Sequence, residues 1–335
     1  MAAIVRKSWM VLMVLILLTA AGCGSEESGS SGGDGEVKGE KMMTVGVTQI
    51  VEHPSLDAAF EGFKAALEEA GLKEGEQVEY DVQIAQGDQN NSQTIANNFK
   101  SDGVDLIFAN STPSAQSALN ATKNIPIVFT SVTDPVGASL VPSMDEAGAN
   151  ITGTTDTHPD AIPSTVKFIN EETDAAKVGM IYNAGEQNSV AQVEIVKEAM
   201  AGTDLEVVEA TVSTSAEVKQ AAESLVGRAD VFYIITDNTV VSALESVIKV
   251  AEDKDIPLFV GELDSVERGG MAAYGFDYYD IGFEAGQMAA QVLQGEKDIS
   301  ELPPQYPQNL KLEINEEAAE AMGVEVKESW KATAE

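Results

Sequence analysis

Short acids, amides and hydroxyls gather where apolar, strand-like runs of this sequence end. Thr48-Gln49 follows the first run, Asn110 to Ser114 the third, and Thr236-Asp237-Asn238 a later one. A zwitterionic molecule needs this mixture, because a carboxylate can pair with its ammonium while hydroxyls and helix N-terminal amides bind its carboxylate. Each residue type is also a preferred helix N-cap, which would explain any one of them alone. As a set, they predict a binding cleft.

Alternating strand-like and helical patterns position these residues. The first series has strand-like runs at 43–50, 78–85, 104–110 and 125–130, with helical patterns at 57–70 and 89–101. The second has strand-like runs at 177–182, 205–212, 231–236, 256–260 and 271–276, with helical patterns at 188–200, 216–226 and 239–252. Such alternation implies parallel sheets covered on both faces, with ligands beyond the carboxyl ends of the strands. We therefore predict an α/β fold of two doubly wound parallel-sheet lobes with a ligand cleft between them.

The chain is expected to pass between the lobes three times, through a three-segment hinge. The block 151–156 is predicted to make the first crossing, and the helix 278–293 with the strand 310–314 to make two more. This assigns 43–155 plus 278–305 to the first lobe and 156–277 plus 306–335 to the second.

The N-terminus reads as an export signal. Arg6 and Lys7 precede the apolar run 9–18, and small residues follow up to Gly22. The run is short for a membrane span, so we interpret 1–22 as a cleaved secretory signal, with an uncleaved anchor as the alternative. Cys23, the only cysteine, follows Ala-Ala-Gly, which resembles a bacterial lipobox with Ala20 at the usual Leu position. Lipidation of Cys23 is therefore expected, and the Gly- and Ser-rich segment 24–41 behaves as a flexible tether.

Composition excludes several classes of function. The 335 residues carry 55 acidic and 20 basic side chains, for a net charge of −35, which argues against nucleic acid and anionic lipid surfaces as partners. Only two histidines are present, His53 and His158, and there is no Cys/His cluster for zinc. We expect His53 to be solvent-exposed or to cap a helix. No dinucleotide, P-loop or nucleophile-elbow motif occurs, so we expect no enzyme, no cofactor and no metal.

Six segments together resemble a known family. They are TQIVEHPSLDAAFEGFKAAL (48–67), AQGDQNNSQTIANNF (85–99), PIVFTSVTDPVGASLV (126–141), IYNAGEQNSVAQVE (181–194), ITDNTVVSALESVIKVA (235–251) and GFDYYDIGFEAG (275–286). In this order they are similar to the ABC-transporter substrate-binding family, whose characterised members bind tryptophan or tyrosine. The resemblance implies a periplasmic-binding-protein type I fold with a closing hinge. It also implies a monomeric receptor outside the cytoplasm that presents a small amino acid to a membrane permease.

By position, the resemblance implies a set of ligand-facing residues. With the strand-end residues Gln49 and Asn238 the set is Gln49, Thr112, Asp134, Asp156, Asn188, Ser189, Asp237 and Asn238. The chain departs from the family in GELDSVERGG (261–270), where relatives tend to have a run rich in Ser and Thr. Glu262 and Asp264 there leave the identity of the ligand open.

Asp237 is the predicted partner of a ligand ammonium. It lies between the apolar run 231–236 and a helix that begins near Thr239. Its competing role is the N-cap of that helix, which Asn would fill as well as Asp. Asp134 and Asp156 are the next candidates for the ammonium.

A sugar or another small polar solute is the alternative ligand, because folds of this kind often host sugars. Sugar sites commonly stack a ring on tryptophan. Trp9 lies in the predicted signal and Trp330 near the C-terminal end, so no tryptophan lies at the predicted strand ends of the cleft. The sequence therefore favours an amino acid over a sugar.

Overall fold

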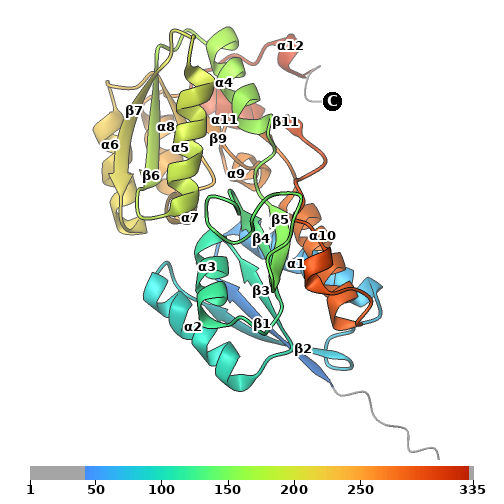
Figure 1. Ribbon diagram of the computed structural model, residues 1–335. Coiled ribbons are helices and arrows are strands. Elements are labelled where there is room, and N and C mark those ends of the chain that lie inside the picture. Colours follow the sequence, from blue (N-terminus) through green and yellow to red (C-terminus); the bar gives the residue numbers. More distant parts are fainter. Residues whose placement is uncertain (1–41, 332–335) are drawn as a thin grey trace, which may run out of the picture. The chain divides into compact units, whose positions relative to one another are not determined.

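The computed structural model describes residues 42–331, which form two parallel-sheet α/β lobes (Figure 1). We call the part built on the five-stranded sheet the first lobe and the part built on the six-stranded sheet the second lobe. Among the described residues no helix is long and apolar enough to cross a membrane. The predicted signal, Cys23 and the tether lie outside the described residues.

The first lobe has a fully parallel sheet in the order β2-β1-β3-β4-β5. Its strands are β1 (Met43–Gln49), β2 (Val78–Ile84), β3 (Leu106–Asn110), β4 (Ile127–Val132) and β5 (Ile151–Thr155). Its helices are α1 (Pro54–Glu69), α2 (Gln89–Asp102), α3 (Thr112–Ala121), α10 (Tyr278–Leu293) and the 3₁₀ turn η2 (Ile299–Glu301).

Both faces of the central strands of this sheet are buried, which explains why β3 and β4 are apolar without alternation. Leu106 and Phe108 of β3 share one apolar cluster with Phe63 of α1, whose ring centroid lies 4.0 Å from that of Phe108. Ile107, between them in sequence, belongs to a second cluster with Phe99 of α2. Because successive side chains point to opposite faces, one strand serves both layers.

The second lobe has the strand order β11-β10-β9-β8-β6-β7. Its strands are β6 (Lys177–Asn183), β7 (Glu206–Val212), β8 (Val231–Ile234), β9 (Leu258–Val260), β10 (Ala272–Gly275) and β11 (Lys311–Ile314). Its helices are α4 (Ala161–Glu172), α5 (Gln187–Met200), η1 (Ser215–Glu217), α6 (Val218–Leu225), α7 (Asn238–Val241), α8 (Leu244–Asp253), α9 (Leu263–Glu267), α11 (Glu316–Ala321) and α12 (Glu328–Lys331). All strands are parallel except β11, which pairs antiparallel with β10.

Two local predictions were wrong. The block 151–156 is not a crossing along its whole length, because Ile151–Thr155 forms strand β5 beside β4 and the chain leaves the sheet only at Asp156. The helix predicted at 239–252 is two helices, α7 and α8, separated at Ser242-Ala243, where Ala243 has non-helical backbone angles. The short α7 keeps Asn238 and Thr239 at a helix N-terminus.

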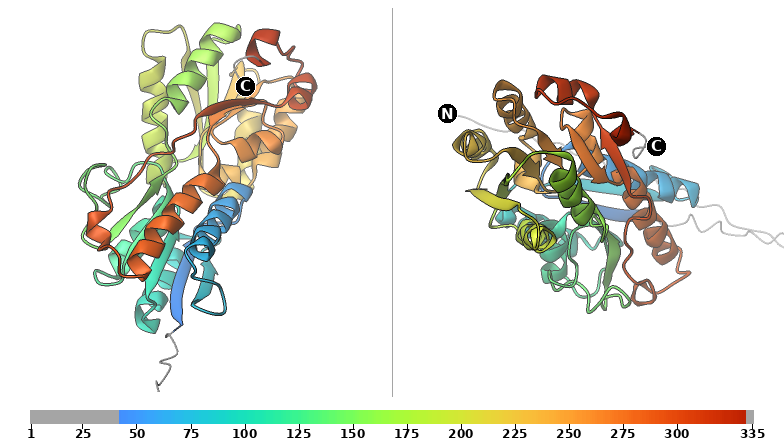
Figure 2. Two further views of the ribbon diagram at one scale, coloured as in Figure 1. Left: turned by 90° about the vertical axis from the view of Figure 1, so that its right-hand side faces the viewer. Right: turned by 90° about the horizontal axis from the view of Figure 1, so that it is seen from above.

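The chain passes between the two sheets after β5, between β10 and α10, and between η2 and β11. Helix α10 returns to the first lobe and packs along α1, as both views of Figure 2 show. Glycines allow this close packing: a Cβ atom on Gly282 would lie 1.9 Å from the Ala59 carbonyl oxygen, and one on Gly62 would lie 2.0 Å from that of Tyr279. The exact lobe limits given above stay a prediction.

Candidate functional site

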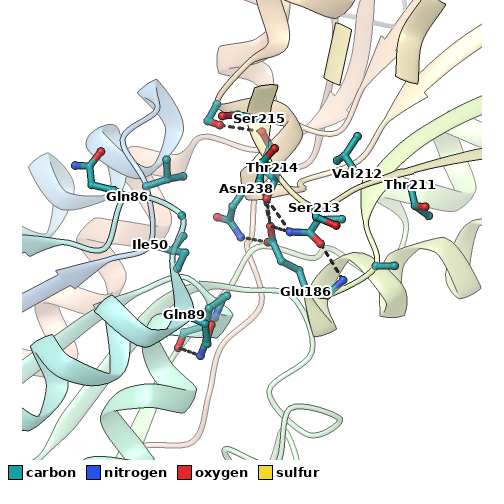
Figure 3. A pocket seen from close by; sticks show the side chains of 18 residues that line it. Ile50, Gln86, Gln89, Glu186, Thr211, Val212, Ser213, Thr214, Ser215 and Asn238 are labelled. Carbon is teal, nitrogen blue, oxygen red and sulfur yellow. Dashed lines mark hydrogen bonds between the residues drawn. The ribbon is translucent and has the colours of Figure 1, made fainter. Parts of the chain in front are cut away.

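A pocket of about 450 Å³ lies between residues of the two lobes (Figure 3). From the first lobe it is lined by Ile50, Val51, Gln86, Gly87, Gln89 and Pro113. From the second lobe it is lined by Asn183–Glu186, Thr211–Ser215, Asn238, Thr239 and Ser242. These residues end or follow β1, β2 and β3 in one sheet and β6, β7 and β8 in the other, so the pocket lies at the carboxyl ends of the strands of both lobes.

The lining combines one carboxylate with many uncharged polar groups. Glu186 is the only charged residue among those that line this pocket. Hydroxyls come from the run 211–215 and from Thr239 and Ser242, and side-chain amides come from both lobes. Ile50, Val51 and Val212 add aliphatic surface. The pocket can therefore hold a cationic group, hydrogen-bonding groups and an apolar body together.

Glu186 ties the N-terminus of α5 to that of α7. It occupies the N-cap position of α5, but its side chain does not cap that helix. Instead Oε2 accepts a hydrogen bond from Asn238 Nδ2 at 2.6 Å. Oε1 accepts from the Thr239 hydroxyl at 2.7 Å and from the Thr239 backbone N–H at 3.2 Å. These donors fix the carboxylate in the pocket wall.

Asp237 lies behind that wall and does not line the pocket. It is 0% exposed and caps α7 by accepting from the Val240 N–H at 2.7 Å. Its second oxygen accepts from the Asn183 N–H and from the Ser189 hydroxyl, both at 2.6 Å. Burial, and then the nearby charge of Glu186, raise its pKa well above the usual range, and the three hydrogen bonds oppose that shift. Its carboxylate is thus engaged by the protein's own donors.

The other predicted residues of the second lobe lie in the same wall. Asn238 lines the pocket. Asn188 is buried, and its amide nitrogen lies 3.4 Å from Glu186 Oε2 and 3.4 Å from the Thr236 carbonyl oxygen. The structure therefore brings Asn188, Ser189 and Asp237 together as supports of the residues that face the pocket.

None of the predicted first-lobe residues Gln49, Thr112 and Asp134 lines the pocket. Gln49 donates to the Val51 carbonyl at 2.9 Å and to Asp57 Oδ1 at 2.8 Å, which holds the loop after β1 against the pocket. Thr112 is buried at the start of α3, and its hydroxyl has no hydrogen-bond partner. Asp134 accepts from the Gly137 N–H at 2.7 Å and closes a turn away from the pocket.

Asp156 belongs to a separate polar layer between the lobes. It accepts from the Thr133 hydroxyl at 2.8 Å and from the Tyr278 hydroxyl at 2.9 Å. Thr133 in turn accepts from Gln192 of α5 at 3.2 Å, a contact between the lobes. Burial raises the pKa of Asp156 to about 6, against the lowering effect of these hydroxyls. Asp156 does not line the pocket.

Two backbone conformations near the pocket are unusual for residues other than glycine. Gln86, which lines the pocket, has φ of 56°, and Ser111, the N-cap of α3, has φ of 114°. Such conformations cost free energy and tend to persist where a site needs a particular side-chain direction. In Figure 3 Gln86 lies on the first-lobe side of the pocket, and the amide end of its side chain points away from Glu186.

His53 is not solvent-exposed, and its side chain does not cap a helix, so both readings of this residue were wrong. It is 6% exposed and occupies the N-cap position of α1, but its side chain makes no cap hydrogen bond and Nδ1 has no partner. Burial, followed by the charge of Arg268, lowers its pKa to about 4. In the described part of the chain no group of three or more His, Cys, Asp and Glu residues is placed to hold a metal ion.

Sequence and fold comparisons identify the family. A family model described as ABC transporter substrate binding protein matches residues 44–335, and the chain belongs to this family. A Clostridioides difficile (strain R20291) protein named tyrosine-binding protein is 42% identical over 320 residues, covering 95% of this chain and 92% of that protein. The chain is thus a substrate-binding protein of the ABC-transporter type.

Two solved structures relate the lobes to ligand binding. A Streptococcus pneumonia ABC domain in complex with L-Trp has 30% identity and a TM-score of 0.82, covering 88% of this chain and 98% of that one. A ligand-free, open structure of a Clostridium difficile substrate binding protein has 42% identity but a TM-score of 0.63, covering 86% and 97%. The Clostridium difficile chain is more identical in sequence but has the lower TM-score. An open hinge in that structure produces this result, because opening moves the two lobes relative to each other.

Proposed function

We propose that this protein captures an amino acid with an aromatic side chain in the pocket between its lobes and delivers it to the permease of an ABC importer. The carrying observation is that Glu186 is the single charged residue lining a pocket that is otherwise hydroxyl, amide and aliphatic. The tyrosine-binding relative and the L-Trp complex support the same class of ligand.

The lining suggests how a zwitterion would lie. Its ammonium faces Glu186, because a buried carboxylate favours a cation over any neutral group. Its carboxylate is received by the hydroxyls of Thr211, Ser213, Thr214 and Ser215. Its ring packs on the aliphatic surface of Ile50, Val51 and Val212.

A sugar is the less favoured ligand. None of the residues that line the pocket is Trp, Tyr or Phe, so a pyranose ring would have no aromatic face to stack on. Trp330 instead packs in the second lobe against Phe168, with ring centroids 4.9 Å apart.

In this account the protein is a receptor and not a catalyst. It works outside the cytoplasm as a monomer, held at the membrane through lipidated Cys23 and the tether 24–41. Glu186 lines the pocket and Asp237 does not, which supports Glu186, rather than Asp237, as the ammonium partner.

A thermal-shift screen of the standard amino acids and common sugars tests the proposal. A ligand present at about 100 times its Kd stabilises the native state by about 2.7 kcal/mol, which raises Tm by several degrees. We expect this response from L-tyrosine or L-tryptophan. A response to sugars alone would overturn the proposed ligand class.

A further inference from the structure

The N-terminal end of α1 in the first lobe packs against α9 of the second lobe. His53 and Ser55 lie on the first-lobe side of this contact, and Glu262, Asp264 and Arg268 lie on the second-lobe side. None of these residues lines the pocket. Opening the lobes would separate the two sides and bring water to both.

His53 is buried in a setting that favours its neutral form. Its Nδ1 has no hydrogen-bond partner, so an imidazolium there would carry an unsatisfied donor. The groups facing it are the Arg268 guanidinium, which repels a positive charge, and the Asp57, Glu186 and Asn238 side chains, which favour one. Burial outweighs the last three, which is why the pKa falls to about 4.

Glu262 is buried and Asp264 is half-buried, in a setting that favours the opposite change. Glu262 is 2% exposed and accepts a hydrogen bond from the Ser265 hydroxyl at 2.8 Å. The Ser55 hydroxyl lies beside both carboxylates, yet it makes no well-aligned hydrogen bond to either. Two neighbouring carboxylates with so few donors resist ionisation.

Further groups around the two carboxylates do not reverse this preference. Glu262 faces the Arg268 guanidinium and the Tyr278 hydroxyl, which both favour its charged form. The same Tyr278 hydroxyl donates a hydrogen bond to Asp156. Asp264 faces Asp277, which disfavours its charge. Burial is the largest influence on both, and it raises the pKa of Glu262 and lifts that of Asp264 from 3.8 to about 6.

We propose that His53 and the pair Glu262 and Asp264 form a contact between the lobes, here called the latch, in which two opposite pH effects offset each other. The latch keeps closure of the lobes, and hence ligand affinity, nearly independent of pH. On closing, the imidazolium of His53 releases a proton to solvent and a carboxylate of the pair takes one up. The two exchanges oppose each other, so closing exchanges few net protons in mildly acidic surroundings.

The two halves of the latch have opposite signs. The His53 pKa is lowered on closing, from 6.5 to about 4, so its contribution to closure is full above 6.5 and is lost as pH falls. The Asp264 pKa is raised, from 3.8 to about 6, so its contribution is present at low pH and is lost as pH rises through 6. From about pH 8 to about pH 5, linkage gives a roughly thirtyfold weakening from His53 and a roughly tenfold tightening from Asp264.

Calorimetric titration of the full chain with L-tyrosine at about pH 5 and about pH 8 separates the halves. Using an amino acid as the probe rests on the proposed function. We expect His53→Gln to bind about tenfold tighter at about pH 5 than at about pH 8. The variant Glu262→Gln/Asp264→Asn should bind about thirtyfold weaker at about pH 5 than at about pH 8. The wild type should change by only about threefold. His158→Gln and Glu61→Gln, which alter a histidine and a carboxylate outside this contact, should follow the wild type. Equal pH slopes in all variants would overturn the latch.

Small-angle scattering of the ligand-free protein gives a second test that needs no ligand. At about pH 5, the radius of gyration of His53→Gln should be smaller than that of Glu262→Gln/Asp264→Asn, and at about pH 8 the two should converge. Identical radii at both pH values would contradict the proposal. Should a double variant fail to fold, Asp264→Asn alone carries the same expected direction. If the wild type binds no amino acid, the proposed function fails while the scattering result still decides the latch.

Discussion

Glu186 and Asp237 form a reciprocal clasp between the N-termini of α5 and α7. Glu186 precedes α5 and accepts hydrogen bonds from Asn238 and Thr239 at the start of α7. Asp237 precedes α7 and accepts one from Ser189 in the first turn of α5. Each helix N-terminus is thus held by the residue before the other helix, and only Glu186 reaches the pocket.

Because Asp237 accepts these internal hydrogen bonds, Asp237→Asn should lower the stability of the ligand-free protein. The Asn oxygen can still cap α7, but its amide nitrogen would face the Asn183 N–H, which then lacks an acceptor. Leaving a buried donor unsatisfied costs about 1–3 kcal/mol. We expect the free energy of unfolding of the ligand-free protein to fall by that amount in denaturant titrations.

An unchanged free energy of unfolding together with weaker ligand binding would instead support Asp237 as the ammonium partner, the role that the sequence suggested. An ammonium partner predicts unchanged stability of the ligand-free protein together with a binding loss of about 2–5 kcal/mol. Ser189→Ala serves as a matched control, because it removes one donor to the same oxygen without adding a donor of its own.

Glu186→Gln should weaken amino acid binding by about 1.5–3 kcal/mol, the range for hydrogen bonds to charged groups. The exchange removes the only charge in the pocket lining while keeping its shape. Glu194→Gln, on an exposed position of the same helix, is the control that should leave Kd unchanged. Equal Kd values for the two variants would refute the assignment of the ammonium to Glu186.

Gly282→Ala should destabilise the first lobe. Its Cβ would lie 1.9 Å from the Ala59 carbonyl oxygen, so α1 and α10 would have to separate. Overpacking of this kind costs about 1–3 kcal/mol, measurable as a lower midpoint of chemical unfolding. Gln287→Ala, on an exposed position of α10, should leave the midpoint within error, and an unaltered Gly282→Ala midpoint would show that the contact yields freely.

Cys23→Ser should release the protein from membranes. After cleavage of the signal, an acyl-bearing Cys23 would be the only membrane tether of the chain. Cell fractionation with an antibody should find the variant shed, soluble or uncleaved. Recovery of a mature-sized Ser variant in the membrane fraction would rule out lipidation as the anchor.

The sequence predicted the two sheets because their central strands are buried on both faces, which leaves apolar runs such as β3 and β8 that stand out from their surroundings. It also predicted that polar residues at strand ends would gather. It could not show which way they turn: Asp237 points inward to Asn183 and Ser189, while its neighbour Asn238 lines the pocket.

Sequence reasoning missed much of the pocket, including Gln86 and the hydroxyl run 211–215. Gln86 follows β2 and the run 211–215 spans the end of β7, and the ends of these two edge strands were not considered. Applying the same strand-end rule to the edges would have found them. Glu186 lay within a predicted loop, but its selection required knowing that α7 begins opposite it.

Calorimetric titration of the wild-type protein with L-tyrosine, L-tryptophan and D-glucose tests the central claim most directly. We predict saturable binding of at least one of the two aromatic amino acids, with Kd on the order of 1 μM, which corresponds to about −8 kcal/mol. Glucose should give no heat beyond dilution. Saturable glucose binding with no response to either amino acid would contradict the account.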